Sequence, residues 1–340
     1  MKLHMQTASA AYDIILERGV IGRIGEYIDL NRKVLILTDQ NIPQKWIDIV
    51  SEQCDNSMVY KVPGGEDSKS MKVYEEVLNA CLDFHMGRKD LMIAVGGGVI
   101  GDLCGFVAAS YMRGIDFMSI PTTTLSQIDS SIGGKTAINL GKVKNIVGAF
   151  HQPKLVLVDL DTLSTLPDRH VKNGLVEAIK AGLIRDPELF ELFEQDDYME
   201  HLEEIIYRSL CMKRDVVSQD EKEGGLRKIL NFGHTIGHGI EAYYNLETYY
   251  HGECVAMGMF YFLGDENLKE RLLAICNRMG IPANAPIDVN AVYEVTTMDK
   301  KASGGLISTI WVDEIGKAYI KDVPQEEIRA ILQGKSLDNK

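Results

Sequence analysis

The chain has 340 residues, 45% hydrophobic and 25% charged, a balance that is typical of a globular protein and argues against extensive disorder. Its 49 acidic residues outnumber its 36 basic ones, and the formal net charge of −13 argues against a nucleic-acid partner, since binding a phosphate backbone requires a basic surface. No stretch approaches the roughly 18 apolar residues that cross a membrane, so we expect no membrane role. At about 150 residues per domain, this length predicts two domains.

The six cysteines show no CxxC spacing, and the N-terminus has no apolar run of signal-peptide length. We therefore expect reduced, mostly buried thiols in a cytoplasmic protein.

The first half of the chain alternates short apolar runs with segments of helical periodicity. Strands are predicted at 34–37, 58–60, 91–95, 115–120 and 155–158. Residues 70–86 place apolar side chains at helical spacing between two of these runs. This rhythm is typical of βαβ units, so we expect an α/β domain with a mostly parallel sheet over residues 1–164.

The second half has a different pattern. Asp186 and Pro187 are typical of a helix start, as N-cap and first helical residue. Apolar residues then repeat at helical intervals over 189–193 and 202–210. We expect a mainly helical domain over 165–340, packed closely against the first, with a cleft between them as the default place for a ligand.

The strand at 91–95 runs directly into Gly96-Gly97-Gly98-Val99-Ile100-Gly101-Asp102, which satisfies G-x-G-x-x-G. Glycines let backbone amides approach a pyrophosphate, and the helix N-terminus beyond adds partial positive charge. A tight strand-to-helix turn explains the same pattern equally well. No acidic residue about 20 positions later is convincing as the usual ribose partner, whereas Asp39 at the end of the earlier strand is better placed for that role.

A second glycine-rich segment, Gly133-Gly134-Lys135-Thr136, is similar to the end of a nucleotide-triphosphate loop. The earlier glycine that this motif requires is absent, which disfavours a nucleotide triphosphatase. The hydroxyls and cations of this region, with Arg113 and Lys144 nearby, suit a single phosphate instead. Each cation taken alone is more often a solvated surface residue.

Histidines and one carboxylate in the second half indicate a metal site. Glu177 and Lys180 are three apart, and His234 and His238 four apart, so each pair shares a helix face. His251 is a third histidine within 18 residues of His234. Imidazoles and a carboxylate suit a divalent metal with an open position for substrate, although each histidine alone is compatible with an ordinary core or surface residue. Spacing favours His234 and His238 as joint ligands and does not separate a ligand from a general base.

Together and in this order, the motifs resemble the 3-dehydroquinate synthase family over nearly the whole chain. The segments that carry the resemblance are Gly96–Asp102, Pro121–Thr123, Asp129–Thr136, Lys144–Phe150, Glu177–Lys180, Asn231–His238 and His251–Glu253. The resemblance implies a Rossmann-like N-terminal domain, a mainly α-helical metal-binding C-terminal domain, tightly bound NAD, a zinc or cobalt ion, and a homodimer.

The family's reaction belongs to the shikimate pathway, and its enzymes are phosphorus–oxygen lyases. The implied substrate is a sugar phosphate, 3-deoxy-D-arabino-heptulosonate 7-phosphate, and the products are 3-dehydroquinate and phosphate. In such enzymes NAD oxidises the hydroxyl at carbon 5, which acidifies the neighbouring proton and permits elimination of phosphate. The hydride then returns to carbon 5, and ring opening and an intramolecular aldol closure follow.

The resemblance also implies residue roles. Glu177, His234 and His251 resemble the metal ligands, with His238 as an acid/base or hydroxyl-contacting group, which replaces the ligand pair that spacing favours. The catalytic or substrate-contacting residues would be Arg113, Asp129, Lys135, Asn145, Asn173, Lys180, Lys213, Glu223, Arg227, Asn231, His238 and Lys300 or its neighbour Lys301. The NAD contacts would be Asp39, Asn41, Glu66, Lys69, Gly97, Gly98, Val99, Asp102, Thr122, Thr123, Lys144, Thr162 and Thr165.

Three alternatives stay open at this point. Another sugar-phosphate cyclase, 2-deoxy-scyllo-inosose synthase, would be expected to carry Glu in place of Asn231 and to lack Arg227. A metal-dependent polyol dehydrogenase shares the glycine loop but would produce NADH. A non-catalytic NAD- and metal-binding regulator could lose Lys135, Lys180 or His238, all of which are present. One small departure from the family is Gly239, where alanine is commoner.

Overall fold

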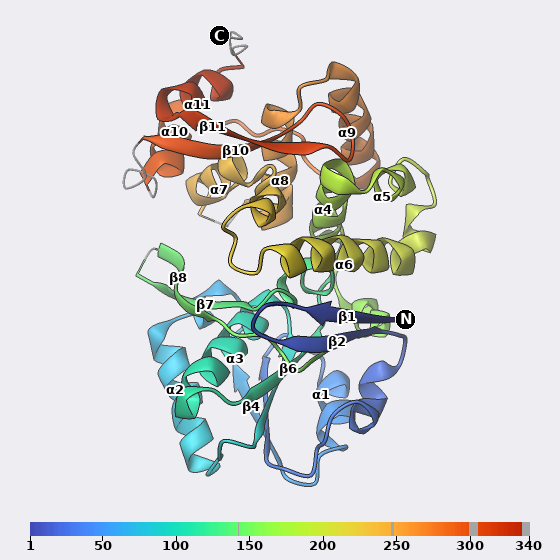
Figure 1. Ribbon diagram of the computed structural model, residues 1–340, viewed down its shortest axis with the longest axis vertical. Helices are drawn as coiled ribbons and strands as arrows, with labels where there is room; N and C mark the ends of the chain where they lie inside the picture. The colour runs from blue at the N-terminus through green and yellow to red at the C-terminus, as the bar shows by residue number, and fades with distance from the viewer. Residues whose placement is uncertain (142, 246–247, 299–304, 335–340) are drawn as a thin grey trace. The chain divides into compact units, whose positions relative to one another are not determined.

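In the computed structural model, the chain folds into two compact units (Figure 1). The N-terminal unit is Met1–Val171 with Val217–Lys222, and the C-terminal unit is Lys172–Val216 with Glu223–Lys340. The structure describes residues 1–141, 143–245, 248–298 and 305–334. Across those residues, no helix has the length and apolar character needed to cross a lipid bilayer.

A seven-stranded sheet forms the centre of the N-terminal unit, in the spatial order β1-β2-β9-β6-β5-β3-β4. Its strands are β1 (Lys2–Gln6), β2 (Ala11–Leu16), β3 (Val34–Asp39), β4 (Ser57–Val62), β5 (Leu91–Gly96), β6 (Asp116–Pro121) and β9 (Leu155–Val158). Every neighbouring pair is parallel except β1 with β2. The predicted α/β class with a mostly parallel sheet is therefore confirmed. The β1–β2 hairpin is not among the predicted strands, although buried Leu3 and Met5 alternate with exposed residues along β1.

The strand order reverses between β3 and β5, which are neighbours in the sheet. The chain leaves β3 for β4 on one side, whereas β5, β6 and β9 follow one another on the other side. Parallel strands end at the same edge, and open α/β sheets bind ligands at that edge where the order reverses. Asp39 ends β3 and Gly96 ends β5, so the glycine motif lies at this position.

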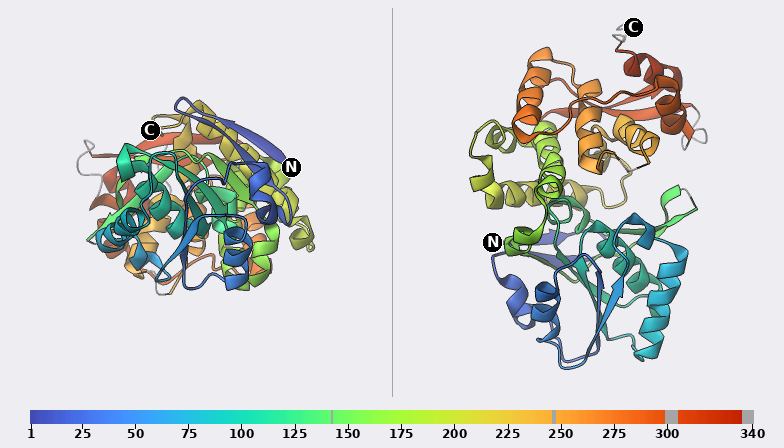
Figure 2. Two further views of the ribbon diagram at one scale, coloured as in Figure 1. Left: turned by 90° about the horizontal axis from the view of Figure 1, so that it is seen from below. Right: turned by 180° about the vertical axis from the view of Figure 1, so that it is seen from behind.

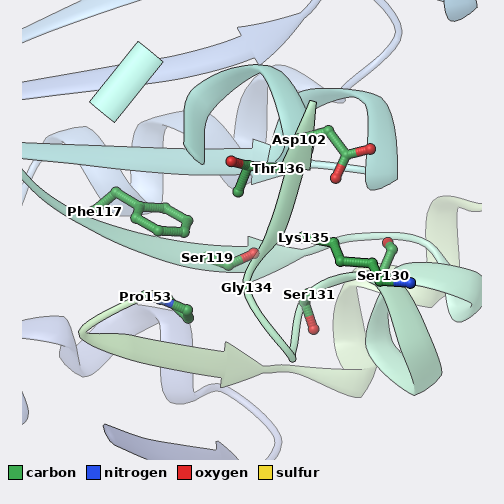
Figure 3. A pocket seen from close by; sticks show the side chains of 10 residues that line it. Asp102, Phe117, Ser119, Ser130, Ser131, Gly134, Lys135, Thr136 and Pro153 are labelled. Carbon is green, nitrogen blue, oxygen red and sulfur yellow. The ribbon is translucent and has the colours of Figure 1, made fainter. Parts of the chain in front are cut away.

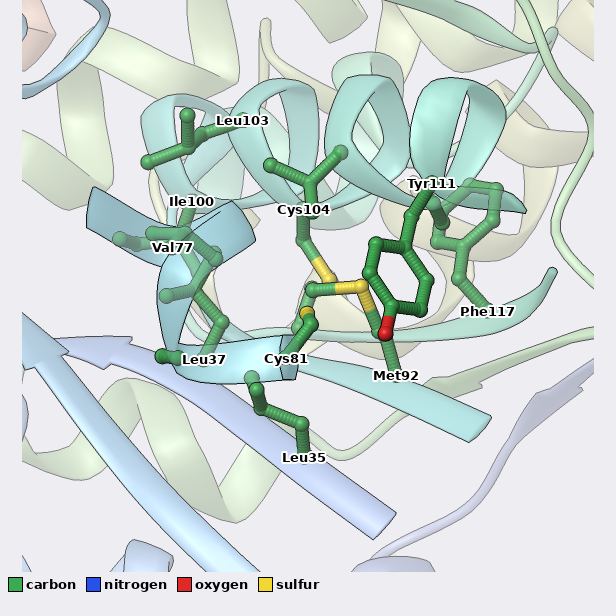
Figure 4. Close-up of a cluster of buried hydrophobic side chains, with 14 of the residues drawn as sticks. Leu35, Leu37, Val77, Cys81, Met92, Ile100, Leu103, Cys104, Tyr111 and Phe117 are labelled. Atoms are coloured by element: carbon green, nitrogen blue, oxygen red, sulfur yellow. The ribbon is translucent and has the colours of Figure 1, made fainter. Parts of the chain in front are cut away.

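Both faces of the sheet are covered by helices, as Figure 2 shows from behind. Leu35 and Leu37 of β3 pack beneath α2 (Met71–Asp83) and α3 (Gly98–Ser110), in the cluster drawn in Figure 4. Val34 and Ile36 face the other way and pack with Trp46 of α1 (Gln44–Ser51). Side chains alternate across a strand, so burial on both faces requires the unbroken apolar runs seen in the sequence.

All six cysteines are free thiols, and five of them are buried. Cys81 and Cys104 lie inside the cluster under α2 and α3 (Figure 4). Burial raises the pKa of Cys81 to about 12 and that of Cys104 well above its ordinary value. Because only the thiolate is reactive, these are inert core residues, in agreement with the predicted reduced state.

Two further elements complete the N-terminal unit near the glycine loop. A short π-helix, η4 (Ser126–Ser130), follows β6, and the hairpin of β7 (Lys135–Leu140) and β8 (Val143–Phe150) follows η4. π-Helical turns are uncommon and occur often at functional sites. Asp129, a predicted substrate residue, lies within this turn.

The C-terminal unit is mainly helical, as predicted. Its helices are α4 (Asp168–Arg185), α5 (Pro187–Leu192), α6 (Leu202–Gln219), α7 (His234–Tyr243), α8 (His251–Met259), α9 (Glu266–Met279), α10 (Val289–Met298) and α11 (Gln325–Leu332), with the ends of α4 and α6 belonging to the N-terminal unit. Asp186 caps α5 by accepting the Leu189 N–H at 3.1 Å. A hairpin of β10 (Leu306–Val312) and β11 (Ala318–Pro324) was not predicted, although its strands are rich in β-branched and aromatic residues.

Glu221 joins three distant segments of the N-terminal unit. Its carboxylate accepts the Ser9 N–H at 3.0 Å, the Ser9 hydroxyl, and the Gln152 side-chain amide at 2.8 Å. Burial by itself raises the pKa of Glu221, but the hydrogen bonds from Ser9 and Gln152 reverse that effect and leave the pKa below its ordinary value. The ionised carboxylate therefore holds the β1–β2 turn and Gln152, the second residue after β8, to the segment 217–222.

We predict that Glu221→Ala lowers the free energy of unfolding of this unit by about 2 kcal/mol, because it removes the acceptor of the buried Gln152 amide and of the two Ser9 donors. The chain's two tryptophans are Trp46 and Trp311, so Trp46 fluorescence in a Trp311→Phe background reports on the N-terminal unit during urea unfolding. The matched control is Glu75→Ala, which replaces an exposed residue of α2 and should change stability by less than about 0.5 kcal/mol. Equal effects of the two substitutions would contradict the anchoring role.

Candidate functional site

The N-terminus of α3 provides the predicted dinucleotide cradle. Gly97 is its N-cap, and no acidic side chain lies in its first turn, so the amide groups and the positive end of the helix dipole are not offset by a neighbouring carboxylate. A Cβ atom on Gly98 would lie 2.8 Å from Ser130 Oγ, so a larger residue there would displace the Ser130 hydroxyl. The Thr122 hydroxyl, at the end of β6, is buried and has no hydrogen-bond partner in the described structure. This edge fits a bound dinucleotide phosphate.

Lys69 connects several of the predicted NAD and substrate residues. It is 4% exposed, and its Nζ donates to Asp102 Oδ2 at 2.6 Å and to the Asn145 side chain. Asn139 extends the network by donating to Glu66 Oε1 at 2.9 Å and by accepting the Asn145 N–H at 2.9 Å. The structure thus brings four predicted residues together. Asn139 is a fifth member that no sequence motif indicated.

The remaining predicted NAD residues differ in the hydrogen bonds and the exposure of their side chains. Asp39 accepts the Asn41 N–H at 2.7 Å, and burial raises the pKa of Asp39 above its ordinary value. The Thr162 hydroxyl donates to the Asp159 carbonyl at 2.7 Å, and the Thr165 hydroxyl accepts the Trp46 indole N–H at 3.0 Å. Both threonine hydroxyls therefore make bonds within the protein, and their contacts to NAD stay predictions. Lys144 is exposed on β8.

A small pocket lies beside this edge (Figure 3). Residues of α3, β6 and the segment 130–136 line it, including Asp102, Ser130, Ser131 and Lys135. The Ser130 and Ser131 hydroxyls are buried without a hydrogen-bond partner among the described residues. Two unused hydroxyls near an exposed lysine are consistent with the predicted phosphate side of the site.

The loop that carries Lys135 is held from both sides. The Gly134 carbonyl accepts the His151 N–H at 2.8 Å, and a Cβ atom on Gly134 would lie 2.5 Å from Gln152 Nε2. Gln152 is the residue that Glu221 fixes, so the backbone before Lys135 rests on the same anchor. Neither Gln152 nor Glu221 is indicated by a motif, because their partners are distant in sequence.

Backbone strain marks three of the predicted substrate residues. Arg113 (φ 71°), Asn145 (φ 54°) and Glu223 (φ 62°) are among six non-glycine residues with positive φ in the described ranges. Left-handed backbone is costly for arginine and glutamate, and it persists where surrounding structure imposes it, commonly at functional sites. The strain supports, independently of any motif, the assignment of these positions to the site.

In the C-terminal unit, three helices bring together the predicted metal ligands. Glu177 Oε1 on α4 lies 3.7 Å from His234 Nε2 on α7 and 3.8 Å from His251 Nε2 on α8. His238 joins the group, since nitrogens of the three histidines all lie within 4.8 Å of one another. Glu177 is 2% exposed, and its Oε1 accepts no hydrogen bond from the described residues. A buried carboxylate oxygen facing two ring nitrogens fits a divalent cation.

The two histidines predicted as metal ligands have pKa values that are shifted in opposite directions. Burial lowers the pKa of His234 well below its ordinary value, so its ring is neutral at pH 7. His234 Nδ1 lies 3.0 Å from the Phe232 carbonyl, which only a protonated nitrogen satisfies, so Nε2 carries the lone pair. For His251, burial lowers the pKa, but hydrogen bonding to Glu241 and the charges of Glu241 and Glu177 together outweigh burial and raise it above its ordinary value.

Close packing of α7 against α8 places these histidines. A Cβ atom on Gly258 would lie 2.0 Å from the Gly233 carbonyl, so a larger residue would separate the two helices. Asn173 Oδ1 accepts the Gly252 N–H at 2.7 Å and holds the start of α8, which is a role that the sequence did not predict. Close packing also accounts for glycine at position 239, because a Cβ atom there would lie 2.4 Å from Thr296 Oγ1 of α10.

The other predicted residues of this unit fall into two groups. Lys180 pairs with Glu177, and Asn231 donates to Glu223 Oε1 at 2.6 Å. Lys213 on α6 and Arg227 on the 3₁₀ helix η7 (Leu226–Asn231) are buried cations. Lys300 and Lys301 lie outside the described residues.

Taken together, these features define a two-unit α/β protein with a doubly wound sheet and a glycine-rich turn in one unit and a helical carboxylate–histidine cluster in the other. Residues 59–173 match the family model of the 3-dehydroquinate synthase N-terminal domain, and residues 174–302 match that of the C-terminal domain. The chain belongs to the 3-dehydroquinate synthase family.

Individual relatives agree with this assignment. A 3-dehydroquinate synthase from Thermoanaerobacter pseudethanolicus is 42% identical over 345 residues, which cover 95% of this chain and 97% of the relative. A 2-epi-5-epi-valiolone synthase from Streptomyces hygroscopicus, solved with NAD⁺ and Zn²⁺, is 26% identical with a TM-score of 0.86 over 96% of each chain. A 2-deoxy-scyllo-inosose synthase, solved with carbaglucose-6-phosphate, NAD⁺ and Co²⁺, shares the fold at 24% identity, with a TM-score of 0.88 over 99% of this chain and 100% of that chain.

We predict that His251→Ala and Glu177→Ala each abolish stoichiometric metal binding, whereas His238→Ala keeps the metal and loses activity. Removing a ligand leaves too few donors for a stable site, while a proton-transfer group does not hold the ion. Metal content after dialysis is measured by mass spectrometry, with the exposed His4→Ala variant as the control. Retention of one metal per chain in His251→Ala, or its loss in His238→Ala, would overturn this ligand set.

Proposed function

We propose that this protein converts 3-deoxy-D-arabino-heptulosonate 7-phosphate to 3-dehydroquinate and phosphate, with catalytic NAD and a divalent metal. The observation that carries the proposal is the buried Glu177 oxygen, which accepts no hydrogen bond from the described residues and faces the ring nitrogens of His234 and His251. The match to family models over both halves of the chain supports the reaction type. Sugar phosphates are accordingly the substrate class.

The chain has residues that could bind each of the two cofactors, the metal ion and NAD. Glu177, His234 and His251 would hold the metal, and the amides of Gly97, Gly98 and Val99 would hold the NAD pyrophosphate. The remaining NAD contacts would come from Asp39, Asn41, Glu66, Lys69, Asp102, Thr122, Thr123, Lys144, Thr162 and Thr165. When bound, NAD supplies reversible oxidation of the carbon 5 hydroxyl, and the metal supplies Lewis-acid polarisation of the substrate oxygens.

Two groups of cationic and polar side chains would bind the two ends of the substrate. Arg113, Lys135 and Asn145 would contact the phosphate, which matches the donors around the segment 130–136. Lys213 and Arg227 would receive the carboxylate, because a buried guanidinium can form two parallel hydrogen bonds with it. This fixes the substrate so that only one carbon is presented for oxidation.

Proton transfer would then depend on a few side chains. A ketone at carbon 5 acidifies the proton on carbon 6; its removal and cleavage of the bond between carbon 7 and the phosphate oxygen release phosphate with the bonding electron pair. His238 would move a proton at the carbon 5 hydroxyl, and Glu223 would accept one, held in place by its bond from Asn231. Asp129, Asn173, Lys180 and Lys300 would complete the contacts to the substrate.

Specificity separates this proposal from a cyclase that acts on a neutral sugar phosphate. An inosose synthase would be expected to carry Glu at 231 and no arginine at 227, whereas this chain has Asn231 and a buried Arg227. The 42% identity to a 3-dehydroquinate synthase supports the same choice. We further propose that the protein acts in the cytoplasm, to which the six free thiols lend support, and that it forms a homodimer with either zinc or cobalt as the ion.

We predict that the enzyme loaded with NAD and metal releases one phosphate for each substrate molecule, without growth of the nicotinamide absorbance, because the hydride returns within each turnover. A chelator should abolish release, and Zn²⁺ or Co²⁺ should restore it. Glucose 6-phosphate, which lacks the carboxylate, serves as the control and should release none. Sustained accumulation of NADH would instead indicate a dehydrogenase.

We predict that Arg227→Ala raises the KM for the heptulosonate phosphate about 10- to 100-fold, the loss expected for charged hydrogen bonds worth about 1.5–3 kcal/mol. The Kd for NAD should change by less than about twofold, and Arg227→Lys should recover part of the loss. Arg214→Ala, which removes a partly exposed arginine paired with Asp215 on α6, is the matched control. Equal weakening of NAD and substrate binding would argue for a general structural defect.

A further inference from the structure

A buried carboxylate that no motif assigns lies next to the proposed metal ligands. Glu241 is 7% exposed on α7, and its Oε2 lies 3.4 Å from His251 Nδ1. It follows His234 by seven residues and His238 by three, a spacing that places all three on one face of the helix. The other nitrogen of His251, Nε2, lies 3.8 Å from Glu177 Oε1. The His251 ring therefore lies between two carboxylates, one at each of its nitrogens.

We propose that Glu241 is a positioning residue that orients His251 and sets the affinity of the site for its divalent metal, an inference that rests on the ligand set of the proposed function. A carboxylate at Nδ1 requires the proton to be on that nitrogen, which leaves the Nε2 lone pair for the metal. The negative charge also increases the basicity of the ring and so strengthens its bond to a cation.

The two proposed histidine ligands differ in the charge of the group that contacts Nδ1. His234 Nδ1 lies 3.0 Å from the Phe232 carbonyl, which orients the ring but carries no net charge. His251 has a full carboxylate in the equivalent place. In addition, Lys180 pairs with Glu177 and offsets part of the charge of that ligand. Glu241 therefore supplies a second negative charge beside the cation, which makes His251 the stronger of the two imidazole donors.

A second buried carboxylate offers a matched comparison. Glu253 is 6% exposed and lies on α8, two residues after His251. It accepts the Tyr250 N–H at 2.9 Å, as part of the cap of α8. Replacing either glutamate with glutamine removes one buried negative charge and keeps an acceptor oxygen. Only the change at 241 neutralises a group that lies against a ring nitrogen of a proposed ligand.

The test is the affinity of the metal-free protein for Zn²⁺, measured by competition with a coloured chelator. Glu241→Gln should weaken binding about 10- to 100-fold, the usual effect of removing the outer partner of a ligating histidine, whereas Glu253→Gln should change it less than about threefold. The visible absorption of the Co²⁺-loaded protein should shift in Glu241→Gln only. If Glu241→Gln does not fold, Glu241→Asp keeps the charge but withdraws the carboxylate, and it should show a smaller loss.

A double-mutant cycle separates this inference from the proposed function. If Glu241 acts through His251, adding Glu241→Gln to His251→Ala should cause no further loss of residual Zn²⁺ affinity. Additive losses of affinity would overturn the role of Glu241 but not the ligand set. The same conclusion would follow if Glu241→Gln kept wild-type Zn²⁺ affinity while His251→Ala lost the metal. Full metal binding by His251→Ala would instead overturn the ligand set itself.

Discussion

The helical unit depends on how it accommodates one buried carboxylate. Glu177 is 2% exposed, and removing an ionised group from water costs several kcal/mol unless positive charge compensates it. Lys180 pairs with one side of the carboxylate, and the other oxygen faces two histidine nitrogens. A cation bound there would complete the compensation. The close packing of α7 and α8 through Gly258 is the structural condition that brings those nitrogens to the carboxylate.

The N-terminal unit is organised around buried charges in a similar way. The positive charge of Lys69 is compensated by Asp102 and Asn145. These contacts fix α3 and the β7–β8 hairpin beside the glycine turn. Glu221 is compensated by Ser9 and Gln152, which steadies the backbone that precedes Lys135. In both cases a charge that is costly to bury is satisfied by residues far apart in the sequence. Such networks tie exposed binding loops to a rigid sheet, which reduces the cost of ordering them when a ligand binds.

Local patterns predicted the central parts of the fold and failed at its margins. The buried strands β3 and β5 are unbroken apolar runs followed by turn residues, and both fall where they were predicted. The hairpins β1–β2 and β10–β11 were missed, since half-exposed strands mix polar with apolar residues. At the site, spacing alone paired His234 with His238 because both lie on one helix. Glu177 lies on a different helix, so spacing did not pair it with the histidines, and its assignment as a ligand came from the resemblance to a family.

The sequence by itself determined the α/β class, the position of the dinucleotide turn and the family of the protein, because each depends on residues that are contiguous or repeat at a fixed period. Only the tertiary structure decided that Asn139 joins the Lys69 network, that Asn173 holds the start of α8 and that Glu241 lies against His251. The physical reason is that hydrogen bonds and charge pairs depend on distance in space, and burial brings together groups that no local pattern connects.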